Sequence, residues 1–215
     1  IADYTRAIEV DPDVTAFSYR ADALKARGEF DRAYADYARA IDLLTQKIDA
    51  ATAKNSDLPA QKRTFMSYDY RDRGDAYVDS GDHDRAIADY SQSIKLMADD
   101  HWSFGRRAAS YLAIGKIDHA LADYYRAIEL SSDDGDHVLG RARTYIARGE
   151  RERAAPDLRT AIEIYSKDIA TYPADPSGYL GRGEAYHETG EIDRAIADYE
   201  VAGANNPSDS QTYRK

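Results

Sequence analysis

Apolar and small residues recur along this chain at the spacing of one face of an α-helix, and the pattern is interrupted at regular points by a glycine. The interrupting glycines are Gly28, Gly81, Gly115, Gly149 and Gly190. Three residues after each stands an acid, namely Asp31, Asp84, Asp118, Glu152 or Asp193. A glycine often ends a helix with a positive φ, and an acid stabilises the start of the next helix. Each unit is therefore predicted to be a helix A, a tight turn and a helix B.

Small and large side chains also recur at fixed distances from these glycines. Seven residues before each glycine, helix A carries Ala21, Gly74, Ala108, Ala142 or Gly183. Nine residues after it, helix B carries Tyr37, Tyr90, Tyr124, Leu158 or Tyr199. Small residues at matched levels let two helix backbones approach closely, and the large side chains fill the space around them. The two helices of each unit should therefore pack against each other as a hairpin.

The units resemble the tetratricopeptide repeat, in its bacterial form. The match is clearest at Arg73–Tyr77 with Asp84–Tyr90, and at Arg182–Tyr186 with Asp193–Tyr199. The resemblance covers nearly the whole chain, and five units in register make it specific. It implies an all-α fold, a right-handed superhelical solenoid of antiparallel helix pairs with five full repeats and a half repeat at each end. It also implies a concave wall lined by the A helices and a role in binding other proteins.

The predicted solenoid is one domain over residues 1–215, and glycine spacings of 53, 34, 34 and 41 residues set its boundaries. They are 1–12 for a half repeat, 14–54 for repeat 1 with a long helix B, 60–100 for repeat 2 with a long helix A, 101–134 for repeat 3, 135–175 for repeat 4 with an extended helix B, 176–209 for repeat 5 and 210–215 for the start of another repeat. The first insert predicts a projecting helical hairpin, with a stop and restart at Asn55–Pro59. Pro156 lies early in helix B of repeat 4, so that helix is expected to start late or to kink. Because the chain opens within a helical element, it is expected to be part of a longer protein.

Composition narrows the possible partners. The 215 residues carry a net charge of −10, which disfavours binding to a nucleic-acid backbone. No apolar run approaches the roughly 20 residues of a membrane-spanning helix, so no membrane insertion is predicted. The absence of cysteine is compatible with a reducing or an oxidising compartment, so bacterial cytoplasm and periplasm both stay open.

Each repeat also carries an arginine before the small residue of helix A and an aspartate before the large residue of helix B. The arginines are Arg20, Arg73, Arg107, Arg141 and Arg182, and the aspartates are Asp36, Asp89, Asp123, Asp157 and Asp198. One interpretation is a ladder of Arg–Asp pairs that ties helices together, since a guanidinium suits fixed bidentate geometry. The alternative is that both side chains are solvated and contribute almost nothing.

Catalytic, metal and cofactor sites are not predicted. The histidines His83, His101, His119 and His137 recur every 18 residues. His83 and His119 are expected at one end of predicted helices about 20 Å long and His101 and His137 at the other, so the four cannot share one ion. The acidic run Ser131–Asp136 lacks the register of a calcium loop and is better explained as helix capping. The sequence contains no phosphate-binding loop or nucleophile elbow.

The resemblance implies that certain helix A positions face a ligand. The predicted peptide-groove residues are Tyr68, Arg71, Asp75, Trp102, Arg106, Ala109, Leu139, Arg143, Ile146, Glu184 and His187. Tyr68 and Trp102 share a repeat position and should lie about 10 Å apart on adjacent helices. Glycines such as Gly140 and Gly181 are expected to form a low floor from which Arg106 and Arg143 could hold a carboxylate. The alternative is that the apolar members only pack one helix A against the next and that Trp102 covers an exposed edge.

The favoured function is therefore a protein-interaction scaffold that binds a peptide or a segment of a partner protein of unknown identity in the groove. A second possibility is a self-assembly module that uses the projecting hairpin or the open ends of the solenoid. A third is a non-catalytic domain of a larger enzyme.

Overall fold

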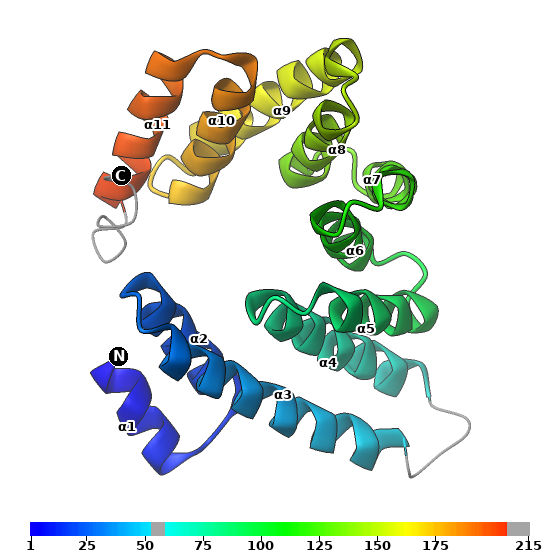
Figure 1. The fold of residues 1–215 in the computed structure, drawn as a ribbon, viewed down its shortest axis with the longest axis vertical. Coiled ribbons are helices and arrows are strands. Elements are labelled where there is room, and N and C mark those ends of the chain that lie inside the picture. The colour runs from blue at the N-terminus through cyan, green and yellow to red at the C-terminus, as the bar shows by residue number, and fades with distance from the viewer. Residues whose placement is uncertain (53–58, 206–215) are drawn as a thin grey trace. The chain divides into compact units, whose positions relative to one another are not determined.

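The computed structural model describes residues 1–52 and 59–205, and this part of the chain is built from eleven α-helices (Figure 1). They are α1 (Ala2–Val10), α2 (Val14–Ala26), α3 (Phe30–Thr52), α4 (Ala60–Asp79), α5 (His83–Leu96), α6 (His101–Ala113), α7 (Ile117–Leu130), α8 (Gly135–Ala147), α9 (Arg151–Thr171), α10 (Pro176–Thr189) and α11 (Ile192–Asn205). The predicted restart signal at 55–58, Pro207 and the start of a further repeat at 210–215 lie outside the described residues.

The helices fall into two units, residues 1–114 with α1–α6 and residues 115–215 with α7–α11. Within each unit, helices that follow one another in the sequence pack side by side (Figure 1). The pairs α2–α3, α4–α5, α8–α9 and α10–α11 are the antiparallel hairpins of repeats 1, 2, 4 and 5. The predicted fold class, an all-α array of antiparallel helix pairs, is confirmed.

The turns between paired helices have the predicted backbone. Gly28, Gly81, Gly115, Gly149 and Gly190 all have positive φ, between 73° and 84°. A residue with a side chain adopts this conformation only at a cost, which explains why glycine recurs there. The predicted acids lie in the first turn of the helix that follows.

Small residues and rings interlock at matched levels inside the hairpins. A methyl group added to Gly74 would lie 2.7 Å from the Tyr90 ring, and one added to Gly183 would lie 2.7 Å from the Tyr199 ring. Ala21, Ala108 and Ala142, which stand at the same position of the other A helices, are fully buried. The close approach that the sequence predicts is therefore present, and each hairpin has no room for a larger side chain at this level.

The Arg–Asp ladder is confirmed in four repeats. The guanidinium of helix A donates two parallel hydrogen bonds of 2.7–2.8 Å to the carboxylate of helix B. The pairs are Arg20–Asp36, Arg73–Asp89, Arg141–Asp157 and Arg182–Asp198. The pKa of each of these arginines is raised, first by its hydrogen bonds to the aspartate. The geometry is bidentate and partly buried, unlike that of a solvated surface pair.

The same arginines also link one repeat to the next. The remaining guanidinium nitrogen donates to a hydroxyl of the preceding helix B: Arg20 to Thr5 at 3.3 Å, Arg73 to Thr45 at 3.1 Å and Arg182 to Ser166 at 3.1 Å. Arg107 donates to Ser91 in the same way, at 2.9 Å. The sequence analysis missed these hydroxyl partners.

The positions of these hydroxyls reveal a change of register after the two long B helices. Thr5 and Ser91 immediately follow the large residue of their helix, whereas Thr45 and Ser166 lie eight residues after Tyr37 and Leu158. Repeats 2 and 5 therefore dock seven residues further along the preceding helix B than repeat 3 does. Seven residues are about two helical turns, or about 10 Å.

Helix α9 corrects one expectation from the sequence. It begins at Arg151, the usual distance after its glycine, and runs without interruption to Thr171 with Pro156 as its sixth residue. Proline lacks the N–H that would bond to the carbonyl of Glu152, so this turn loses one hydrogen bond. The helix does not start late, and it continues through Pro156, with Ala154, Leu158 and Ala161 buried in the core.

Candidate protein-interaction surface

In the first unit, two aromatic side chains of the predicted groove are exposed on A helices. Tyr68 on α4 is 37% exposed, and Trp102 on α6 is 43% exposed. Arg71 lies over the Tyr68 ring at 4.8 Å, and Arg106 lies over the Trp102 ring at 5.8 Å. Each pair sits one turn apart on its helix, so the arginine stem and the ring form one ridge.

Arg106 also connects the two helices. Its Nε lies 3.7 Å from Asp75 on α4, and Asp75 accepts a 2.7 Å hydrogen bond from the Tyr90 hydroxyl. The Arg106 side chain is 51% exposed, so this ion pair is weak. Ala109, one turn beyond Arg106 on α6, is exposed as well. The first unit thus presents Tyr68, Arg71, Asp75, Trp102 and Arg106 on the adjacent helices α4 and α6.

In the second unit, Arg143 is held by two acids of the next A helix. It lies 3.1 Å from Glu184 and 3.2 Å from Glu188 on α10. The sequence analysis proposed that Arg143 could hold a carboxylate of a ligand and missed Glu188. The signal was available, since Glu188 follows Glu184 by one helical turn.

The remaining predicted residues of the second unit divide between surface and core. Leu139 is 3% exposed and belongs to the hydrophobic core cluster, and Ile146 packs against that cluster. Leu139 therefore packs its helix, which is the alternative that the sequence left open. Glu184 is half-buried beside Arg143, and His187 is exposed.

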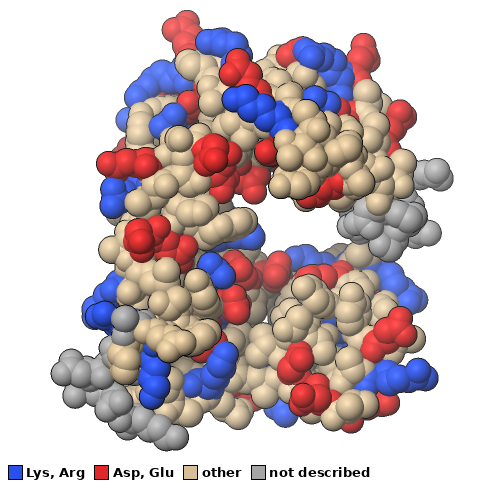
Figure 2. All heavy atoms as spheres, turned by 180° about the vertical axis from the view of Figure 1, so that it is seen from behind, with Lys and Arg blue, Asp and Glu red and all other residues tan. Residues whose placement is uncertain are grey.

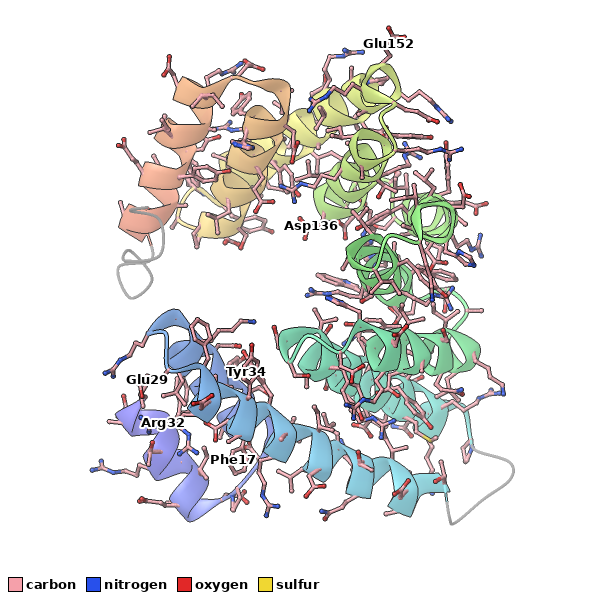
Figure 3. All side chains as sticks on the ribbon, in the orientation of Figure 1. Phe17, Glu29, Arg32, Tyr34, Asp136 and Glu152 are labelled. Atoms are coloured by element: carbon pink, nitrogen blue, oxygen red, sulfur yellow. The ribbon has the colours of Figure 1, made fainter. Side chains whose placement is uncertain are left out.

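The predicted glycine floor is wrong in the second unit. Gly140 and Gly181 are buried, and an added methyl group would lie 2.3 Å from the ring of Tyr124 or Tyr165 respectively. These glycines make room for a tyrosine of the preceding helix B instead of exposing backbone to a ligand. Tyr165 also donates a 2.5 Å hydrogen bond to Asp136, which Figure 3 shows on α8.

Two further tyrosines of B helices donate hydrogen bonds to aspartates of A helices in the same way. Tyr37 donates to Asp22 at 2.6 Å, as Tyr90 does to Asp75. Burial and these carboxylates raise the pKa of Tyr37 and of Tyr90. Asp79 of α4 has a raised pKa through burial and then through Asp22, with Lys25 acting against the shift at 3.7 Å.

Charges of both signs are interspersed on the face drawn in Figure 2, with no single basic area gathered there. Among residues 1–52 and 59–205, no helix has the length and apolar character needed to cross a bilayer.

Taken together, the hairpins, the turn glycines and the exposed faces of the A helices define a helical repeat protein. The family model described as the tetratricopeptide repeat matches residues 71–136, 106–169 and 139–210. These matches cover more than half of the chain, and the protein belongs to the tetratricopeptide repeat family. Proteins of this family act as protein-interaction scaffolds. No curated protein matches the chain.

Two solved structures with TM-scores above 0.5 show the same fold at low sequence identity. The thermophilic tetratricopeptide repeat protein TTC0263 of Thermus thermophilus is 17% identical, with a TM-score of 0.56, and the match covers 93% of this chain and 96% of that one. A variant of the kinesin-light-chain repeats of Podosopora anserina is 18% identical, with a TM-score of 0.57 and coverage of 91% and 98%. YrrB, described as having an unusual peptide-binding site, is 17% identical with a TM-score of 0.42 and coverage of 99% and 98%.

Proposed function

We propose that this protein is a non-catalytic scaffold that binds a segment of a partner protein on the exposed faces of its A helices. The observation that carries the proposal is the exposure of Tyr68 and Trp102 on α4 and α6, each beside an arginine. Aromatic and arginine side chains supply much of the binding energy in protein interfaces. Tyr and Trp rings bury a large area at small entropic cost. Membership of the tetratricopeptide repeat family supports the same function.

The surface would recognise a mixed segment rather than a purely acidic one. Arg106 already has an acidic neighbour in this chain, so an incoming carboxylate would compete with Asp75. An apolar side chain of the partner would bury the rings of Tyr68 and Trp102.

Trp102 is the single tryptophan of the chain and therefore also reports on binding. A photo-crosslinking amino acid at position 109, which is exposed on the same helix, would identify the partner in cells, and the affinity of the purified pair would then be measured. Trp102→Ala should weaken binding by at least about 1 kcal/mol, roughly fivefold, without changing helix content.

The matched control is Tyr172→Ala, which removes another exposed aromatic side chain, 66% exposed, at the end of α9. It should leave the affinity unchanged. Equal affinities for wild type and Trp102→Ala would remove this surface from consideration.

A further inference from the structure

Two aromatic side chains lie uncovered at the start of α3. Phe30 is 53% exposed and Tyr34 is 48% exposed. They are one helical turn apart and therefore share a face, called here the Phe30–Tyr34 face. Figure 3 shows Tyr34 on α3, with Glu29 and Arg32 near the turn from α2. A pair of large rings left half in water is costly unless another molecule covers it.

The equivalent face of α7 is covered by the next A helix. Ile117 and Leu121 stand two and six residues after Gly115, as Phe30 and Tyr34 do after Gly28. Leu121 is 7% exposed and forms a core cluster with Tyr145 of α8, against which Ile117 and Ile146 also pack. In this repeat, the two positions therefore pack against the helix A of the next repeat.

The seven-residue change of register uncovers the face in repeat 1. Tyr77 of α4, the counterpart of Tyr145, belongs to a core cluster against which Ile41 packs. Ile41 lies seven residues beyond Tyr34, so α4 meets α3 about two turns, or about 10 Å, further along. Phe30 and Tyr34 consequently lie beyond the end of the helix that would have covered them.

Helix α9 provides an internal comparison. Repeat 5 docks on α9 with the same change of register, and the positions two and six residues after Gly149 are Arg151 and Ala155. A polar and a small residue are what a helix face in contact with water usually carries. Helix α3 instead has two aromatic residues at these positions, which indicates a face that another helix covers.

An acidic residue lies next to the two rings. Asp31 follows Phe30 on the first turn of α3 and is exposed. The charge beside the rings would favour a positively charged side chain on an incoming helix.

We propose that the Phe30–Tyr34 face of α3 is a docking site for an amphipathic helix of a partner protein. The helix presents apolar side chains to the two rings and a lysine or arginine to the exposed Asp31. This site is distinct from the Tyr68–Trp102 surface of the proposed function and does not depend on it.

The chain itself supplies a suitable test ligand. A stapled peptide with the sequence of residues 135–147 contains Tyr145 and Ile146, which cover the equivalent face of α7, and the basic residues Arg141 and Arg143. The staple is needed because so short a helix is barely populated in water. Fluorescence anisotropy of the labelled peptide would be measured with the full chain, beside a scrambled stapled peptide.

The expected result is saturable binding of the peptide and no binding of the scrambled control. The double variant Phe30→Ser, Tyr34→Ser should weaken binding at least tenfold while circular dichroism stays unchanged, since both rings are exposed. The double variant Arg151→Ser, Ala155→Ser, altered at the matching positions of α9, and Trp102→Ala should both bind as the wild type does.

Three results would overturn the proposal. They are the absence of saturable binding, equal binding by the Phe30→Ser, Tyr34→Ser variant, and a concentration-dependent dimer that this variant abolishes. The last would identify a second copy of the chain as the molecule that covers the face.

Discussion

At the scale of single residues, the arginine of helix A does more than the sequence indicates. Arg73 donates two hydrogen bonds of 2.7 Å to Asp89 and one of 3.1 Å to Thr45 on the preceding helix B. One side chain thus joins three helices, with side-chain exposures of 14% for Arg73 and 7% for Asp89. Partial burial makes the pair stronger than an exposed ion pair and also makes loss of one partner costly.

We expect Arg73→Lys to lower the free energy of unfolding by about 1 to 3 kcal/mol, because lysine keeps the charge but cannot donate in parallel to both carboxylate oxygens. Urea unfolding of the wild type, Arg73→Lys, Asp89→Asn and the double variant would measure the effect and the coupling. The exposed pair Arg39–Asp42 is the control, and Arg39→Lys should change stability by less than about 0.5 kcal/mol. A coupling energy near zero would mean that the ladder is only a geometric coincidence.

At the scale of secondary-structure elements, helix length sets how one repeat docks on the next. Helices α5, α7 and α11 have 14 residues each, whereas α3 has 23 and α9 has 21. In both long helices the following repeat packs seven residues later, as the positions of Thr45 and Ser166 show. A slip of seven residues keeps the same helix face toward the neighbour, because seven residues are close to two full turns.

Within α9, Pro156 should cost stability without being needed for the fold. We expect Pro156→Ala to raise the free energy of unfolding by about 1 to 3 kcal/mol, because alanine restores the hydrogen bond to the carbonyl of Glu152. Thermal unfolding would measure the change. Pro176→Ala is the matched control, since Pro176 is the first residue of α10, where proline is favourable. A destabilised Pro156→Ala variant would contradict this account of α9.

At the scale of the whole molecule, the chain carries excess negative charge, and the pKa values of several carboxyl groups are raised. Burial and neighbouring acids raise the pKa of Asp79, with Asp22 the largest acidic contribution, and of Asp168, with Asp133 the largest. Burial also raises the pKa of Asp72, with Asp75 and Asp69 adding to it. A net charge of −10 adds a general repulsion that favours proton uptake by the folded chain.

We expect the melting temperature to rise as the pH falls from 7 toward about 5. A carboxyl group with a raised folded-state pKa binds its proton more readily when folded, so it stabilises the fold as the pH falls through that pKa. The capping acids Asp82 and Asp175 have lowered pKa values and lose their contribution only below the unfolded value near 4. Calorimetry from pH 7 to pH 4.5 would test this.

The control for the pH dependence is Asp79→Asn, which removes one of the responsible groups. It should raise the melting temperature at pH 7 and flatten the profile, since the amide carries no charge to repel Asp22. A melting temperature that falls steadily between pH 7 and pH 5 would show that the raised pKa values do not govern stability.

The sequence by itself determined the repeat. Glycine at the turns, small residues opposite rings and the Arg–Asp pairs are local chemistry at fixed spacing, and sequence spacing fixes which residues share a helix face. The family, the order of the helices and the ladder could therefore be predicted residue by residue.

Only the tertiary structure decided how repeats meet, because that depends on packing between helices distant in sequence. It buried Gly140 and Gly181 under Tyr124 and Tyr165, and it gave Arg143 its two acidic neighbours. In the tertiary structure α4 also packs about two turns further along α3, and Phe30 and Tyr34 are exposed. An equivalent position has the same place on its helix in every repeat. The neighbour that covers it depends on the register between helices, and sequence spacing alone does not determine that register.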